Sequence, residues 1–248
     1  MGDSQRRNSG LIRWLRSLRE GLIVEDKSPP SVTPLLEEGI IRLPPKRAWP
    51  GMRQETVFVL DRSLSMGKKD FKPTRLDGAK GGVEAALEKR THLSPDDRVA
   101  LVAFNGIATV ESPLVSLSET AGLKTRLACL TPDDGTDLAA GLTAACGLFR
   151  EAEPRTRDRL LRRVLLLTDG HGGKPKRVAQ TLKTDLAVLL EVIGIGGDPA
   201  EVNEELLRQV ATTDETGFTH YWFIDDTSRL VQHYEDLATG LVWKGQTR

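Results

Sequence analysis

Three oxygen-bearing side chains, Asp61, Ser63 and Ser65, alternate directly after an apolar run at residues 56–60. The run is rich in β-branched and aromatic residues, which is typical of a buried strand. Polar groups crowded onto the turn after such a strand cost desolvation free energy unless something binds them. Carboxylate and hydroxyl oxygens are ligands that Mg²⁺ accepts, at about 2.0–2.1 Å. The turn therefore predicts a divalent-cation site; the simpler alternative is that Asp61 and Ser63 only cap the following helix.

This D-x-S-x-S turn resembles the metal-ion-dependent adhesion site of von Willebrand factor type A (vWA) domains of the bacterial intracellular type. The family pattern adds a Thr in a later loop and an Asp after a later strand. Thr136 in PDDGTDLAAGL and Asp169 in VLLLTDG stand in those contexts and in that order. The resemblance covers residues 55–242. It implies that Mg²⁺ or Mn²⁺ is bound by five residues, namely Asp61, Ser63, Ser65, Thr136 and Asp169.

Strand-like and helix-like patterns alternate along the chain, which predicts an α/β fold with a mostly parallel sheet covered on both faces. The predicted strands are residues 56–60, 98–104, 108–117, 163–168, 186–195 and 219–224. The predicted helices are residues 76–89, 118–127, 136–150, 174–183, 199–211 and 227–242. The resemblance implies a Rossmann-like six-stranded sheet with one antiparallel edge strand, and Pro113 favours the edge for residues 108–117. Asp61 and Asp169 should then converge where the strand order reverses.

The composition fits one globular domain with an extension, since 39% of the 248 residues are hydrophobic and 28% are charged. We expect an N-terminal extension at residues 1–50, with an amphipathic helix at 9–24 and a Pro-rich linker. The vWA domain should span residues 51–243, followed by a C-terminal tail at 244–248.

Charge and hydropathy limit the classes of partner. The formal net charge is +0, so nothing global favours nucleic acid as a partner. No apolar run reaches the roughly 18 residues of a transmembrane segment. Arg13, Arg16 and Arg19 interrupt the apolar stretch that a signal peptide would need. We therefore expect a cytoplasmic protein.

The resemblance implies a protein-interaction module, an adaptor rather than an enzyme. An acidic side chain of a partner protein would complete the coordination of the metal. Proteins of this type often resemble partners of MoxR-type AAA+ ATPases or of stress-response kinase and phosphatase modules, and the sequence does not select among them.

Three further residues are expected at the rim of the site. Leu64 stands where the family usually has Gly, and Asp134 stands where many members have a small residue. With Asp133, Asp134 should tighten metal binding and weaken attraction for an acidic ligand. His171, two residues after Asp169, is a candidate rim contact or base.

Two alternatives from other functional classes stay open. One is a metal-dependent hydrolase that uses Asp61 and Asp169, although no motif supplies a nucleophile or a second metal cluster. The other is a membrane-peripheral scaffold held by the amphipathic helix at residues 9–24.

Overall fold

The computed structural model describes residues 52–152 and 160–239. The predicted extension at residues 1–50, with its amphipathic helix and linker, and the predicted tail at 244–248 lie outside the described residues. Within the described ranges, no helix is both long enough and apolar enough to cross a membrane.

In the described residues, six strands form one sheet in the order β3-β2-β1-β4-β5-β6. All neighbouring pairs are parallel except β2 and β3, which are antiparallel. The strands are β1 (Arg53–Asp61), β2 (Arg98–Phe104), β3 (Ala108–Ser116), β4 (Leu160–Thr168), β5 (Val188–Ile195) and β6 (Tyr221–Ile224). The structure confirms the predicted mostly parallel six-stranded sheet with one antiparallel edge strand.

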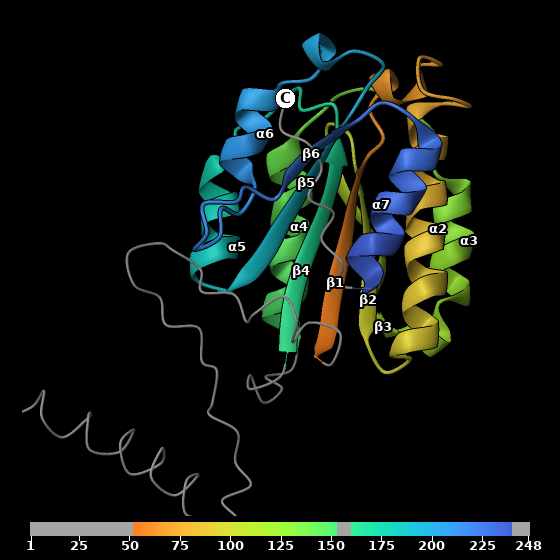
Figure 1. Cartoon of the computed structure of the whole chain (residues 1–248), viewed down its shortest axis with the longest axis vertical. Helices are drawn as coiled ribbons and strands as arrows, with labels where there is room; N and C mark the ends of the chain where they lie inside the picture. Colours follow the sequence, from red (N-terminus) through yellow and green to blue (C-terminus); the bar gives the residue numbers. More distant parts are fainter. Residues whose placement is uncertain (1–51, 153–159, 240–248) are drawn as a thin grey trace, which may run out of the picture. The chain divides into compact units, whose positions relative to one another are not determined.

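Six α-helices of the described ranges cover the two faces of the sheet (Figure 1). They are α2 (Arg75–Leu93), α3 (Ala121–Cys129), α4 (Leu138–Glu151), α5 (Lys176–Thr184), α6 (Glu204–Val210) and α7 (Thr227–Thr239). One face packs under α2, α3 and α7, and the other under α4, α5 and α6. In β1, Phe58 and Leu60 enter the first core, whereas Val57 and Val59 enter the second. Because both faces of the strand are buried, its sequence is apolar without alternation.

Two of the predicted helices are divided in the structure, and the helix predicted at 76–89 extends over Arg75–Leu93 as α2. The predicted helix at 199–211 is divided into a 3₁₀ turn, η5 (Pro199–Glu201), and α6. Asn203 causes the break, because its side chain accepts a hydrogen bond from the Leu206 N–H and starts a new helix. The predicted helix at 118–127 is likewise divided into η3 (Leu117–Glu119) and α3. The last helix is described to Thr239, so the predicted part at 240–242 lies outside the described residues.

The amino ends of the strands bury carboxylates against arginines. Glu55 accepts hydrogen bonds from Arg98 and from the Arg162 Nε, the latter at 3.0 Å. Glu191, in the middle of β5, is fully buried and pairs with Arg163, whose Nε lies 2.8 Å from Oε2 of Glu191. Arg163 also donates to the Leu237 carbonyl at 2.9 Å.

A second buried pair, Arg90 with Asp97, lies at the same end. Arg90 also donates to the Ala238 carbonyl at 3.2 Å. The last carbonyls of α7 thus receive hydrogen bonds from buried guanidinium groups, which satisfies acceptors that a helix end leaves without partners.

Candidate metal centre

The candidate centre lies at the carboxyl ends of β1 and β4, at the upper end of the sheet in Figure 1. β1 pairs with β2 on one side and with β4 on the other, so the order of the strands reverses there. Ligand crevices form at such reversals. Asp61 is the last residue of β1, and Asp169 directly follows Thr168, the last residue of β4. The fold therefore brings the two predicted carboxylates to the same crevice.

Asp61 is completely buried and accepts hydrogen bonds only from neutral groups among the described residues. Its Oδ1 accepts the Ser63 N–H at 2.8 Å, and its Oδ2 accepts the Thr168 hydroxyl at 2.6 Å. Burial raises the pKa of Asp61 to about 6; the hydrogen bonds from Ser63 and Thr168 lower it, and the charge of Asp169 raises it further. No lysine or arginine of residues 52–152 and 160–239 forms an ion pair with Asp61, so this buried carboxylate is suited to binding a cation.

Ser63 and Ser65 point their hydroxyl oxygens toward one another, 3.0 Å apart. Neighbouring ligands in an octahedral Mg²⁺ site, each about 2.1 Å from the ion, are separated by about 3 Å. The two hydroxyls are therefore spaced as two ligands of one ion would be. A short 3₁₀ turn, η2 (Leu64–Gly67), sets this spacing directly after the strand.

Asp169 is also buried, but a buried guanidinium lies beside it. Oδ2 of Asp169 is 3.4 Å from Nη1 of Arg75, the first residue of α2. Arg75 has no exposed surface and is held by Asp70 and Glu201 as well. Asp169 is thus partly neutralised before any metal binds, in contrast to Asp61.

Thr136 lies on a loop between the other two parts of the centre. Asp133 forms a bridge with Ser63, which places this loop beside the turn after β1. On the other side, a Cβ atom at Gly172 would lie 2.2 Å from the carbonyl oxygen of Thr136. Gly172 has a φ of 94°, so both the backbone and the close approach require glycine.

The helix predicted at residues 136–150 begins two residues later than expected, because α4 spans Leu138–Glu151. Asp137 is the N-cap, because its Oδ1 accepts the N–H groups of Ala139 and Ala140 at 2.9 and 3.3 Å. The Thr136 hydroxyl is therefore not used in capping the helix.

The three predicted rim residues have different environments. The Leu64 side chain is 61% exposed next to Ser63 and Ser65. Asp134 is exposed, and its Oδ1 accepts the Gly135 N–H at 2.8 Å. The ring of His171 is exposed, with Nε2 2.7 Å from the Glu201 carbonyl oxygen, so this ring joins two loops. The charge of Asp133, expected to act with Asp134, is offset by Arg62 at 3.1 Å.

Sequence reasoning missed three residues that support the centre. Thr168 donates a hydrogen bond to the Asp61 carboxylate. Its position directly before Asp169 could have indicated that it lies at the centre. Asn105 follows β2 at the same end of the sheet and donates to Asp133 and to the Asp134 carbonyl at 3.1 and 2.8 Å. Arg75 had no signal, because its contact with Asp169 joins residues 94 positions apart.

The donor set fits a hard divalent cation. Among the described residues, no group of three His, Cys, Asp or Glu side chains is placed to hold a metal ion. The candidate centre instead combines two carboxylates with hydroxyl oxygens, a set that suits Mg²⁺ or Mn²⁺ and not the softer metals bound by Cys and His.

Comparisons with known proteins agree with this architecture. Residues 56–171 match the family model described as von Willebrand factor type A domain. No curated protein matches the sequence of the chain.

Several solved structures share the fold. The conserved hypothetical protein BatB from Bacteroides thetaiotaomicron is 21% identical, covering 75% of this chain and 98% of its own, with a TM-score of 0.58. The vWF domain of the type V pili tip protein Mfa5 from Porphyromonas gingivalis is 15% identical, covering 79% and 98%, with a TM-score of 0.62. A von Willebrand factor type A protein from Catenulispora acidiphila is 19% identical, covering 77% of this chain and 43% of its own, with a TM-score of 0.57.

Proposed function

This chain contains a von Willebrand factor type A domain, and we propose that the domain is a metal-dependent protein-binding module. Domains of this family are generally protein-interaction modules. The observation that carries the proposal is the buried Asp61, which has no cationic partner among the described residues and lies behind two hydroxyls spaced for one ion. Ser63, Ser65 and Thr136 would contribute hydroxyls to Mg²⁺ or Mn²⁺, and Asp61 and Asp169 would contribute charge.

The bound ion would offer an open coordination position to a carboxylate oxygen of a partner protein. Apolar residues around the centre support a protein as the partner. Leu64 is 61% exposed, and Ile107, in the turn between β2 and β3, is 68% exposed. Gly106 in that turn lies against Gly135, next to Thr136. Two exposed apolar side chains beside a metal-binding loop are a small surface on which a partner can pack.

A MoxR-type AAA+ ATPase or a stress-response kinase or phosphatase module stays the predicted class of partner, in a cytoplasmic system. That prediction comes from the family resemblance. Nothing in the described residues adds support to the hydrolase alternative, and the contact that the His171 ring makes, between Nε2 and the Glu201 carbonyl, joins two loops.

The first test is a calorimetric titration of the whole chain with Mg²⁺ and with Mn²⁺. We expect one site, and Asp61→Ala should weaken binding at least 100-fold, because it removes a buried charge that only the ion balances. Asp198→Asn is the matched control, since it removes an exposed carboxylate after β5, at the same end of the sheet, and should leave the affinity unchanged. Equal affinities for wild type and Asp61→Ala would refute the metal site.

The second test concerns the open coordination position. Acetate added to the Mn²⁺-loaded chain should displace a water molecule from the ion, which lowers the enhancement of water-proton relaxation. Unchanged relaxation at saturating acetate would leave a metal site but refute recognition of an acidic side chain.

A further inference from the structure

A buried guanidinium next to the candidate metal centre contacts three carboxylates. The Arg75 side chain has no exposed surface, which is unusual for arginine. Its Nε lies 3.0 Å from Oδ1 of Asp70, and its Nη2 donates to both Asp70 and Glu201. Its Nη1 lies 3.4 Å from Oδ2 of Asp169. A guanidinium is planar and has five N–H donors, so this single side chain can hold three carboxylates in fixed directions.

The three carboxylates belong to three loops at the carboxyl ends of the strands. Asp70 comes after β1, Asp169 after β4 and Glu201 after β5. The loops after β1 and β5 also touch directly, because the Gly197 N–H donates to Oδ2 of Asp70 at 3.0 Å. A Cβ atom at Gly197 would lie 2.9 Å from the Cβ of Asp70. Arg75 therefore connects Asp169 to both of these loops.

Among the described residues, Arg75 is the only charged group that contacts the Asp169 carboxylate. The other oxygen of this carboxylate, Oδ1, accepts one long hydrogen bond, from the His171 N–H at 3.4 Å. Asp61 is held more firmly, since its two oxygens accept hydrogen bonds at 2.8 and 2.6 Å. The direction of the Asp169 carboxylate therefore depends on Arg75 more than on any other group of the described ranges.

A positive charge this close to the centre repels a divalent cation unless other charges offset it. Asp70 and Glu201 supply two negative charges around the guanidinium. Lys68 supplies a second positive charge, because its Nζ lies 2.9 Å from Oε2 of Glu201. These two positive and two negative side chains add no net charge, so the region keeps the two negative charges of the centre's own carboxylates.

Given the metal-binding function proposed above, on which this role rests, we propose that Arg75 is a positioning residue of the metal centre. Arg75 directs Asp169 toward the ion, whereas Asp70 and Glu201 hold Arg75 and cancel the charge with which it would repel the ion. The side chains of Asp70 and Glu201 are 28% and 45% exposed, so their charges can be altered from the surface without contact with a metal ligand. A change of charge at either residue should therefore change the affinity for metal.

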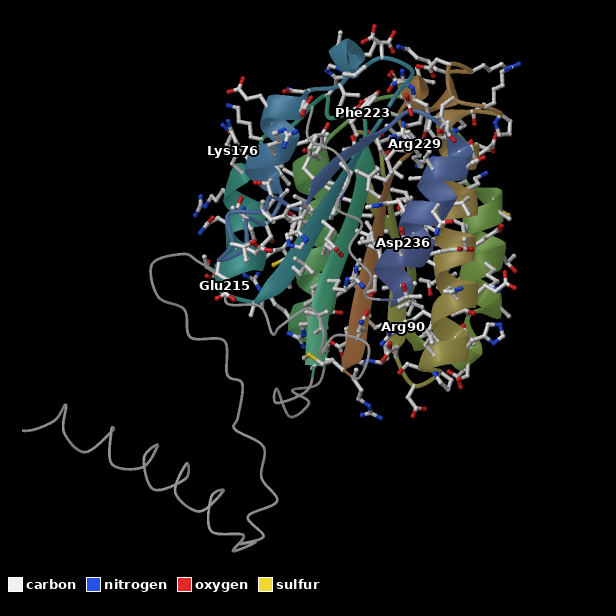
Figure 2. The ribbon with its side chains drawn as sticks, in the orientation of Figure 1. Arg90, Lys176, Glu215, Phe223, Arg229 and Asp236 are labelled. Atoms are coloured by element: carbon white, nitrogen blue, oxygen red, sulfur yellow. The ribbon has the colours of Figure 1, made fainter. Side chains whose placement is uncertain are left out.

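A calorimetric titration of the full chain with Mg²⁺ tests the balancing of the charge. Asp70→Asn keeps the shape of the side chain but leaves the charge of Arg75 unbalanced, so Mg²⁺ should bind about tenfold more weakly. Asp225→Asn is the matched control, because Asp225 also follows a strand at this end of the sheet and pairs with an arginine, Arg229, at 2.7 Å. Figure 2 shows Arg229 on α7. This control should bind Mg²⁺ with the affinity of the wild type.

The same substitution in an Arg75→Gln background distinguishes action through Arg75 from direct attraction of the ion by Asp70. Without the guanidinium, Asp70→Asn should change the Mg²⁺ affinity less than about threefold, because the two residues act as one unit. An equal loss of affinity in both backgrounds would overturn the proposal. Glu201→Gln repeats the test without a change in the core and should weaken binding about tenfold. Unchanged affinity in Glu201→Gln would overturn the proposal even where Arg75→Gln does not fold.

Arg75→Lys tests the positioning of Asp169. Lysine keeps the positive charge but has no planar group to hold three carboxylates, so the Mg²⁺ affinity should fall about fivefold. In EDTA, the His171 amide, which donates to Asp169, should exchange with solvent faster than in the wild type, and amides of β1 should not change. Wild-type affinity and exchange in this variant would overturn the positioning role. If the wild type binds no Mg²⁺, the metal centre itself is refuted, whereas wild-type affinity in every variant refutes only the role of Arg75.

Discussion

The two ends of the strands bury carboxylates with different partners. Toward the amino ends, Glu55, Asp97 and Glu191, the last in the middle of β5, each pair with at least one arginine. At the carboxyl ends, Asp61 accepts hydrogen bonds only from neutral donors of the described residues. Among the described residues, the first three carboxylates therefore have arginine partners, whereas Asp61 has none.

The paired carboxylates stabilise the fold, whereas Asp61 belongs to the candidate metal centre. Buried ion pairs at the amino ends hold elements together, as where Arg163 joins β4, β5 and the last turn of α7. The carboxylate at the other end destabilises the fold while it is ionised without a cation. Asp169 is intermediate, because Arg75 offsets part of its charge. An unbalanced buried charge is what a cation-binding site needs before the ion arrives.

The largest expected effect comes from breaking the balance at the amino ends. Arg163→Met leaves Glu191 buried without its arginine and should lower the free energy of unfolding by about 3–5 kcal/mol. Denaturant unfolding at pH 7 measures this loss. Arg229→Met, which removes an exposed arginine of α7, should cost less than about 1 kcal/mol. Similar small losses in both variants would show that the pair at Glu191 is not needed for charge balance.

Removing the unbalanced charge should have the opposite sign. In EDTA at pH 7.5, Asp61→Asn should raise the free energy of unfolding by about 3 kcal/mol, because the pKa of Asp61 is raised from 3.8 to about 6. The same variant should lose the stabilisation that Mg²⁺ gives the wild type. Asp97→Asn is the matched change at the amino ends and should destabilise, since Arg90 loses its partner. If Asp61→Asn destabilises the protein without metal, the two ends do not differ as described.

The smallest expected effect is the change of the free energy of unfolding with pH. Between pH 3.8 and about 6, native Asp61 binds more protons than unfolded Asp61, so wild-type stability in EDTA should fall as pH rises. In this pH range, the free energy of unfolding of the wild type, taken relative to that of Asp61→Asn, should fall by about 1.4 kcal/mol per pH unit. Metal affinity should rise about tenfold per unit up to pH 6 and then level off, which calorimetry at several pH values measures. If the difference in free energy of unfolding between wild type and Asp61→Asn did not change with pH, the raised pKa of Asp61 would be contradicted.

The sequence predicted the parts of the molecule that local patterns determine. The apolar run at residues 56–60 and the polar turn after it placed Asp61 at a strand end, and β2 was predicted with its observed bounds. The family resemblance, and not a local pattern, placed Asp169 beside Asp61, because it implied that their two strands are neighbours and neighbouring parallel strands end together.

Long-range pairs could not be predicted in this way. Glu55 lies in a strand that looks apolar, and its partner Arg162 is 107 residues away. Arg75 begins an ordinary helix, and nothing nearby in the sequence indicates that it contacts Asp169. The capping residues Asn203 and Asp137 were missed for a different reason, since several polar residues at each site could cap and only the backbone geometry selects one.

The hydrogen bond between Thr168 and Asp61 also has a consequence for folding. It joins residues 107 positions apart, across the pairing of β1 with β4. Contacts of such sequence separation form late, because closing the intervening chain costs entropy. The candidate ligands would therefore be scattered in the unfolded chain and in early intermediates, so the ion should increase the lifetime of the folded state and leave the refolding rate unchanged.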